Sequence, residues 1–239
     1  MNFINPMQIG GLQKLTLIDF PGKIACTVFL AGCNFYCPWC HSRELVMPKE
    51  IKKLPKISEK DFLDFLQERR GLLEGVAICG GEPTLNKELP SFCQKIKTLG
   101  FSVKLDTNGS NPVMLSELIS NGLVDYVAMD VKLPFERYVE VCNNQDEAFD
   151  VQQSINILKA EKVDYEFRTT VVSSVHARED ILKIARWLSP AKRYYLQNFR
   201  PEKTIDPEFE KVVPYPTEFL TEVQQVIAPF FEVCQVRSL

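Results

Sequence analysis

The feature that most constrains the fold is a repeated order of apolar strand, polar loop and amphipathic helix. Strands are expected at residues 23–30, 76–79, 102–106, 124–130, 165–172 and 193–199. Helices are expected from Ser58 onward and over 90–99, 112–120, much of 134–161, 177–188 and 217–228. Residues 12–22 should add a short strand and a turn, 43–57 a surface connection, and 231–236 a terminal strand. This alternation predicts a parallel sheet built from right-handed β/α units.

Length and composition indicate one globular domain. The chain has 239 residues, 45% apolar and 25% charged, enough to bury a substantial core. No repeat or low-complexity linker divides it, so we expect a single domain over 1–239, with its core at about 22–200 and a C-terminal extension of helix and strand at 201–239. Periodicity alone does not distinguish a doubly wound sheet from a barrel.

Charge and hydropathy argue against several classes of protein. The net charge of −3 argues against a general surface for nucleic acid or anionic membranes. The first residues lack the basic start of a signal peptide, and no run approaches the ~20 apolar residues of a membrane-spanning helix. We therefore expect a cytoplasmic protein with no nucleic acid and no membrane among its partners.

Eight cysteines without an export signal indicate a reducing compartment, with metal-binding or core roles rather than disulfides. Five are scattered and are expected to be small buried hydrophobes: Cys26, Cys79, Cys93, Cys142 and Cys234. The other three, Cys33, Cys37 and Cys40, follow a predicted strand with the spacing C-x3-C-x2-C. Thiolates this close in sequence can chelate one soft metal centre, because the loops that close are short.

Four kinds of site fit parts of this segment. Zinc could take the three thiolates and His41, although the adjacent Cys40 and His41 point differently from the chain. A c-type haem or a thioredoxin-like pair would use Cys37 and Cys40 and leave Cys33 without a role. A four-iron cluster usually takes four thiolates, so three would leave one iron open to another ligand. An open position is a mark of a chemically active metal site.

The aromatic Trp39 completes a C-x3-C-x-aromatic-C spacing that resembles the signature of the radical S-adenosylmethionine (SAM) enzymes. The runs GLQKLTLIDFPG at 11–22 and VFLAGCN at 28–34, followed by Cys40-His41, look like a narrower group, the activating proteins of anaerobic ribonucleoside-triphosphate reductase. The similarity is strongest over 10–48 and continues in pieces to about residue 200. Ser42 departs from the group, which commonly has Asn after the His.

The resemblance implies an α/β fold, a partial (β/α)6 TIM-like barrel that is open on one side. It also implies a [4Fe-4S] cluster on Cys33, Cys37 and Cys40, with S-adenosyl-L-methionine bound to the fourth iron through its amino and carboxylate groups. One electron would cleave SAM to a 5′-deoxyadenosyl radical, which would abstract hydrogen from a glycine of a partner enzyme. The implied partner is anaerobic ribonucleotide reductase, a glycyl-radical enzyme, and the implied electron donor is a flavodoxin or a ferredoxin.

Alternatives to this function differ in substrate or in class. The protein could act on another glycyl-radical enzyme of the pyruvate formate-lyase type, or on a small molecule as 7-carboxy-7-deazaguanine synthases do. A compact chain without a further cysteine cluster favours an activase. A non-catalytic zinc-binding or haem-carrying module is the alternative from another class.

Polar motifs at strand ends supply candidate cofactor-binding residues, because that edge carries the active site in α/β barrels. Gly80-Gly81-Glu82-Pro83 follows the strand at 76–79. Glycines permit close backbone approach, and the carbonyls and the Glu82 carboxylate could accept hydrogen bonds from an ammonium group. The resemblance assigns this motif to the SAM amino group, and it places Trp39 with the cofactor.

Two later strand ends carry charged or amide side chains. Asp106 and Asn108 match a family motif that lies near the ligand, although Asn-Gly is also a common tight-turn pair. Asp130 and Lys132 share a face if the strand persists, either as a structural ion pair or, as the resemblance implies, near the cofactor ribose and carboxylate.

Four further residues are weaker candidates. Arg168 lies among apolar strand residues and needs a carboxylate partner, which could be the cofactor's or an internal Asp or Glu. Gln197 could meet the adenine edge of SAM. His41 has a family match near the cluster, whereas His176 is expected at the surface or in the core.

Overall fold

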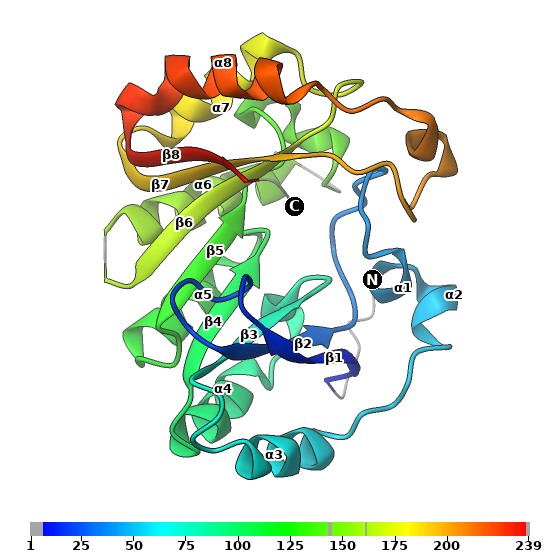
Figure 1. The fold of residues 1–239 in the computed structure, drawn as a ribbon, viewed down its shortest axis with the longest axis vertical. Helices are drawn as coiled ribbons and strands as arrows, with labels where there is room; N and C mark the ends of the chain where they lie inside the picture. Colours follow the sequence, from blue (N-terminus) through cyan, green and yellow to red (C-terminus); the bar gives the residue numbers. More distant parts are fainter. Residues whose placement is uncertain (1–6, 143–144, 161, 238–239) are drawn as a thin grey trace.

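An eight-stranded sheet curves through the molecule, and the order of its strands follows the chain (Figure 1). The computed structural model describes residues 7–142, 145–160 and 162–237. The strands are β1 (Ile9–Thr16), β2 (Ala25–Leu30), β3 (Gly75–Gly80), β4 (Ser102–Thr107), β5 (Tyr126–Asp130), β6 (Asp164–Val171), β7 (Ala191–Asn198) and β8 (Phe231–Arg237). β1 pairs antiparallel with β2, and every later pair is parallel.

Helices on the outside of the sheet connect successive parallel strands (Figure 1). The α-helices are α1 (Arg43–Val46), α2 (Pro48–Ile51), α3 (Glu59–Glu68), α4 (Leu89–Thr98), α5 (Pro112–Ser120), α6 (Gln145–Lys159), α7 (Arg178–Leu188) and α8 (Thr217–Ile227). Short 3-10 turns lie at η1 (Pro83–Leu85), η2 (Phe135–Glu140), η3 (Pro207–Lys211) and η4 (Ala228–Phe230). Six β/α units result, from β2–α3 to β7–α8, and β1 and β8 form the two edges. The predicted open (β/α)6 barrel is confirmed.

Local sequence explains where several helices begin and end. The Ser58 side chain accepts a hydrogen bond from Asp61 N, and Asp61 accepts one from Ser58 N, so a capping box starts α3. Asn111 accepts from Met114 N before α5, which has the bounds that the sequence predicts. Gly122 follows α5 with a φ of 64°, a left-handed conformation that glycine adopts without strain.

The segment 43–57 differs from the predicted surface connection. Helices α1 and α2 occupy part of it and bury Leu45, Val46 and Ile51. The reason is a contact distant in sequence, since Leu45 packs on Gly10 of β1, where a Cβ would lie 2.7 Å from Leu45 Cδ2. In the expected helical stretch 134–161, η2 and α6 are observed, and residues 143, 144 and 161 lie outside the described part.

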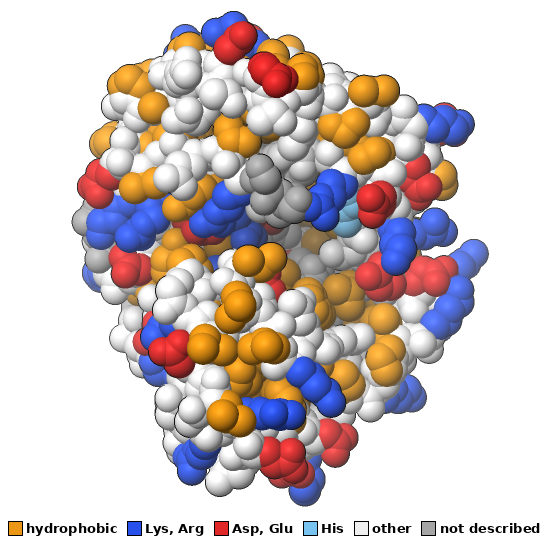
Figure 2. Space-filling model, in the orientation of Figure 1, with side chains coloured by type: hydrophobic (Ala, Val, Ile, Leu, Met, Phe, Trp, Pro, Cys, Tyr) orange, Lys and Arg blue, Asp and Glu red, His pale blue; other side chains and the backbone are white. Residues whose placement is uncertain are grey.

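Alternation along the strands separates an apolar outer face from a polar inner face. On β4, Val103 and Leu105 belong to the apolar core, whereas Lys104 and Asp106 pair with each other on the opposite face. Figure 2 shows the molecule hollowed between the half that carries β1 and β2 and the half that carries β7 and β8. In the described part of the chain, no helix is both long enough and apolar enough to cross a membrane.

Candidate active site

A cavity of about 200 Å³ lies where β2 to β6 end. It is lined by most of the predicted site residues: Cys33, Cys37, Trp39, Cys40, Gly80, Gly81, Asp106, Asn108, Asp130, Lys132 and Arg168. Glu82, Pro83 and Gln197 lie outside this lining, although Gln197 is in register with the lining residue Thr170. Segments from five strand ends, far apart in sequence, therefore meet at the edge where α/β barrels carry their active sites.

The cysteine loop that follows β2 is fastened by backbone hydrogen bonds to several distant segments. Gly32 N donates to Leu45 O at 2.7 Å, and Tyr36 N donates to Val141 O at 3.0 Å. From the loop after β7, Ile205 N donates to Cys40 O at 3.1 Å, and Asp206 N donates to Pro38 O at 2.9 Å. The loop is thus positioned by the whole barrel, and its three thiols face one cavity.

The three thiols are neutral at neutral pH in the metal-free protein. Burial is the largest cause, and it raises the pKa of Cys33 to about 12, with the Glu82 carboxylate adding to the rise. Burial likewise raises the pKa of Cys37 and of Cys40, while the nearby Lys132 ammonium lowers both. Thiolates, not thiols, bind metals, so metal binding must release the thiol protons. The positive charge of the metal then stabilises the thiolates that burial otherwise disfavours.

The arrangement around His41 bears on the kind of metal site. His41 lines the cavity, but its Nδ1 lies 2.9 Å from Glu202 O, and its ring packs on Phe199 at a centroid distance of 5.4 Å. Among the described residues, no three His, Cys, Asp or Glu side chains converge so as to hold a single metal ion. A four-iron cluster binds each thiolate to a separate iron, and three thiols around one cavity fit that requirement.

Gly80 and Gly81 are required by the packing of the chain on itself. A Cβ on Gly80 would lie 2.1 Å from Leu30 O, and one on Gly81 would lie 2.0 Å from Gly32 O. Hydrogen bonds from Gly81 N to Leu30 O and from Glu82 N to Gly32 O, at 2.9 and 2.7 Å, join the two segments. We expected these glycines to admit a ligand; the structure shows that they first admit the start of the cysteine loop.

The Glu82 carboxylate is turned into the protein. It is 1% exposed and accepts hydrogen bonds from Thr84 N and Oγ1, Thr107 Oγ1 and Asn108 N at 2.5 to 3.0 Å. Burial raises the pKa of Glu82, and these donors lower it. In this structure the carboxylate joins the end of β3 to the end of β4, and it does not face the cavity as an ammonium acceptor would.

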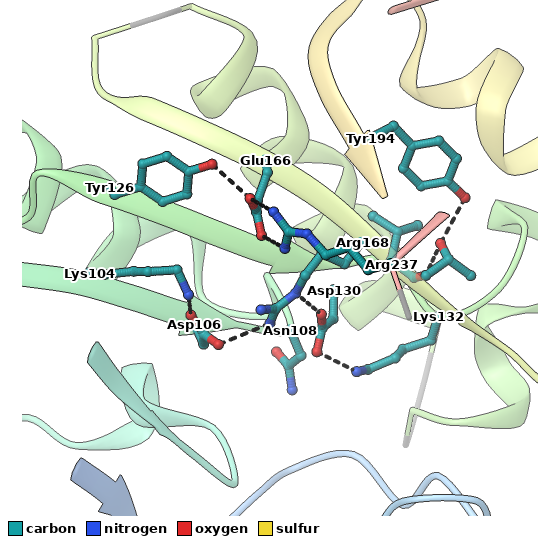
Figure 3. A network of polar contacts seen from close by, with 12 residues as sticks. Lys104, Asp106, Asn108, Tyr126, Asp130, Lys132, Glu166, Arg168, Tyr194 and Arg237 are labelled. Atoms are coloured by element: carbon teal, nitrogen blue, oxygen red, sulfur yellow. Dashed lines mark hydrogen bonds and ion pairs between the residues drawn. The ribbon is translucent and has the colours of Figure 1, made fainter. Parts of the chain in front are cut away.

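A chain of alternating charges crosses the inner face of the sheet (Figure 3). Arg168 Nε lies 2.8 Å from Asp130 Oδ1, and Arg168 Nη2 lies 3.1 Å from Asp106 Oδ2. Lys132 Nζ extends the chain to Asp130 Oδ2 at 2.9 Å, and Lys104 pairs with Asp106 at its other end. The predicted Asp130–Lys132 pair is present, and the carboxylate partners of Arg168 are internal.

This network stays ionised. Burial would raise the pKa of Asp130 and of Asp106, but Arg168 with Lys132 and Lys104 outweighs burial and holds both pKa values below the usual range. Burial would lower the pKa of Lys132, but the Asp130 carboxylate raises it above its usual value. The cavity therefore offers fixed cationic and anionic groups to a charged cofactor.

Two residues hold the backbone of Lys132. Tyr138 Oη accepts from Lys132 N at 2.9 Å, and His176 Nε2 lies 2.7 Å from Lys132 O. His176 Nδ1 accepts from Val172 N at 3.1 Å, so Nε2 carries the proton and donates to Lys132 O. His176 is fully buried, and the core was one of the two locations predicted for it. Its ring contacts Trp39 edge-on at a centroid distance of 6.0 Å.

Several charged residues of the inner face were not predicted from the sequence. Glu166 and Arg237 form a second charged layer on β6 and β8, and Lys104 pairs with Asp106. Charged residues that alternate with apolar ones, as in Val103-Lys104-Leu105 and Tyr165-Glu166-Phe167, carry the signal that could have found Lys104 and Glu166. Arg237, in the last strand, carries no such motif.

The scattered cysteines divide into three groups. Cys26 and Cys93 are fully buried in the core, as predicted. Cys142 and Cys234 are half-buried and pack against the core. Cys79, expected to be a core hydrophobe, instead lines the cavity at the end of β3, because the strand turns this side chain toward Asp106 and Arg168.

Comparison with known proteins agrees with the geometry. Residues 27–188 match the model of the radical SAM superfamily. The chain is 34% identical, over 97% of its length and 96% of the other, to a protein of Methanocaldococcus jannaschii with the provisional name glycyl-radical enzyme activating enzyme. It is 29% identical to the 7-carboxy-7-deazaguanine synthase of Thermococcus kodakarensis over 46% of this chain and 50% of that one.

Solved structures share the fold. The protein anSMEcpe with bound AdoMet has a TM-score of 0.60 at 18% identity, over 87% of this chain and 62% of that one. SuiB of Streptococcus suis bound to S-adenosylmethionine has a TM-score of 0.63 at 13% identity, over 85% of this chain, which spans about half (48%) of SuiB. A matched model over most of the chain and a relative aligned almost end to end place this protein in the radical SAM superfamily of enzymes, whose cofactors are a [4Fe-4S] cluster and S-adenosylmethionine.

Proposed function

We propose that the protein is an activase that generates the glycyl radical of anaerobic ribonucleoside-triphosphate reductase. The observation that carries the proposal is the alignment, over 97% of this chain, with a protein named as a glycyl-radical enzyme activating enzyme. The open barrel supports it, because a glycine in a protein loop must approach the cavity from outside. The choice of reductase rests on the resemblance of residues 11–22 and 28–34 to that subgroup.

In this proposal Cys33, Cys37 and Cys40 hold the cluster. Gly80 and Gly81 border it and offer backbone groups to the SAM amino group, and Trp39 lines the same cavity. When bound, the cluster and SAM supply a 5′-deoxyadenosyl radical, which takes a hydrogen atom from the glycine Cα and leaves a glycyl radical and 5′-deoxyadenosine. Asp106, Asn108 and Glu82 organise the wall at the ends of β3 and β4, and Pro83 starts the turn η1 behind it.

The charged network has the role of orienting the cofactor. Lys132, held through its backbone by Tyr138 and His176, presents an ammonium beside the cysteine sulfurs. Arg168 fixes both Asp130 and Asp106, so the cavity presents a rigid pattern of charge to the methionine and ribose groups. Gln197, in register on β7 with the cavity-lining Thr170 of β6, would meet the adenine.

The enzyme would work in the cytoplasm under anaerobic conditions and would receive its electron from a flavodoxin or ferredoxin. An exposed four-iron cluster that is open to a small ligand is sensitive to oxygen, so this context matches the chemistry.

The test is transfer of the radical to a partner. Reconstituted protein, a chemical reductant, SAM and an anaerobic ribonucleotide reductase are incubated without oxygen. The expected result is a glycyl-radical doublet in the electron paramagnetic resonance (EPR) spectrum and about one 5′-deoxyadenosine per radical, with the Cys37→Ala variant as the inactive control. Cleavage of SAM without a radical on the reductase would reject this partner, and a pyruvate formate-lyase type enzyme would then be tested in its place.

A small-molecule substrate is the second candidate, supported by the partial similarity to 7-carboxy-7-deazaguanine synthases. It is ranked second because the alignment with the Thermococcus protein covers 46% of this chain, whereas that with the activase-like protein covers 97%. Formation of 7-carboxy-7-deazaguanine by the reconstituted protein would favour it over the activase.

A further inference from the structure

The side-chain amide of Asn108 is aimed at the sulfur of Cys33. Its Nδ2 lies 3.9 Å from Cys33 Sγ and 3.1 Å from Asn34 Oδ1. The first distance suits an N–H donor on sulfur, since a sulfur atom is larger than oxygen. Asn108 is 5% exposed, so the contact is shielded from water.

Neighbouring groups fix which end of this amide faces the thiol. Asn108 Oδ1 accepts a hydrogen bond from Ser110 N at 2.9 Å, so the NH2 group is the end that turns toward Asn34 and Cys33. Asn108 N donates to the buried Glu82 carboxylate at 2.6 Å, which holds the backbone. Asn34 Oδ1, which accepts a hydrogen bond from the Asn108 NH2 group, is itself held in place by Ser110 Oγ at 3.2 Å. The donor is therefore preorganised.

We propose that Asn108 tunes the reduction potential of the iron–sulfur cluster by donating an N–H···S hydrogen bond to the Cys33 thiolate. Reduction adds an electron to the cluster and increases the negative charge on its sulfur ligands. A hydrogen bond to such a sulfur stabilises the reduced form more than the oxidised form and raises the potential.

A negative charge lies close to Cys33, and the Asn108 donor offsets its effect on the sulfur. The Glu82 carboxylate is buried and lies 2.6 Å from Asn108 N, and its negative charge disfavours further negative charge on the nearby sulfur. Asn108 stands between the two groups, bonded through its backbone to Glu82 and through its side chain to Cys33. Asn108 therefore acts on a ligand of the iron–sulfur cluster, in addition to the role near the cofactor that its motif implies.

The experiment is a redox titration of reconstituted protein, followed by the EPR signal of the reduced cluster without SAM. The Asn108→Leu variant removes the donor at similar volume, and its midpoint potential should be more negative than that of the wild type. The matched control is Asn156→Leu, since Asn156 is exposed on α6 and lies outside the cavity lining. It should keep the wild-type potential.

A second variant guards against loss of folding. Asn108→Asp keeps the size and the acceptor for Ser110 but replaces the donor with a negative charge, so its potential should fall further than that of Asn108→Leu. Wild-type potentials in variants that retain their iron would overturn the proposal. Loss of the cluster from both would also overturn it, because Asn108 would then hold the loop rather than tune the cluster. The titration includes no partner enzyme, so its outcome is independent of the radical-transfer test.

Discussion

Glu166 of β6 and Arg237 of β8 form a bidentate ion pair inside the barrel, with Nη1–Oε1 and Nη2–Oε2 distances of 2.6 and 2.7 Å. Glu166 is fully buried and also accepts a hydrogen bond from Tyr126 Oη at 2.7 Å (Figure 3). The guanidinium lies 3.5 Å from the centre of the Tyr195 ring. The pair thereby ties the last strand of the sheet to strands in its middle.

Removing Arg237 should destabilise the fold measurably. The Arg237→Leu variant leaves the buried Glu166 carboxylate with only part of its partners, and we expect the free energy of unfolding to fall by about 2 to 3 kcal/mol. Urea unfolding of the metal-free protein measures it. The control is Lys211→Leu, which breaks a pair with Glu208 whose side chains are 72% and 73% exposed. That change should cost less than about 0.5 kcal/mol, and equal costs would contradict the structural role of Arg237.

Iron content separates the cysteines of the loop from the others. The Cys37→Ala variant should lose nearly all of the about four irons per chain expected of a four-iron cluster, because a ligand is gone. The Cys142→Ala variant should keep them, since Cys142 Sγ lies at Tyr138 O, 2.9 Å away, and outside the cavity lining. Iron and sulfide analysis after anaerobic reconstitution measures both. Equal loss in the two variants would argue against the assignment of the ligands.

Gly81 should tolerate no side chain. In the Gly81→Ala variant the new Cβ would meet Gly32 O at 2.0 Å, so β3 and the cysteine loop must separate. We expect a loss of about 3 kcal/mol or more and poor cluster retention. Gly122→Ala is the matched control, because its Cβ would meet no atom within 4 Å and only its φ of 64° is unfavourable. It should cost about 1 kcal/mol and leave the iron content unchanged. A stable, fully loaded Gly81→Ala protein would contradict the close approach.

The metal-free protein should lose stability as pH rises above about 9. Burial raises the pKa of Cys26 and of Cys93 from 9.0 to about 12. Between these values the unfolded chain has released its thiol protons while the folded protein retains them, so rising pH favours unfolding. Each thiol contributes up to about 1.4 kcal/mol per pH unit in this window.

A double variant isolates this effect from other titrating groups. Cys26→Ala with Cys93→Ala should be less stable than the wild type at pH 7 but should lose less stability between pH 8 and pH 10. Urea midpoints under reducing conditions give both curves. If the curves ran parallel, the buried thiols would not be the cause.

Strand ends were the most predictable part of the site. Asp106 and Asp130 each close an apolar strand with a carboxylate, and parallel strands bring such ends together at one edge, so both were found from sequence. Glu82 was assigned to the right loop, but its orientation depends on Thr107 and Asn108, more than twenty positions away. Side-chain direction of this kind is set by packing and has no local signature.

Other features depended on contacts that no local pattern encodes. Helices α1 and α2 form where Leu45 covers Gly10, and neither segment alone predicts the pairing. Arg237 gains its role only because β8 lies beside β7, in parallel, at the edge of the sheet. Apolar periodicity revealed the repeated β/α order and hence a parallel α/β sheet, whereas the open barrel was predicted from the family resemblance.

The bonds from Ile205 to Cys40 and from Asp206 to Pro38 have a consequence for the order of events in the cell. In a growing chain, the three cysteines of the loop emerge from the ribosome well before Ile205 and Asp206. Until these two residues have been synthesised, the loop lacks two of the backbone hydrogen bonds that hold its shape. We therefore expect a cluster to enter the correctly shaped loop only after the chain has been synthesised past residue 206, because a shorter nascent chain lacks these two hydrogen bonds to the loop.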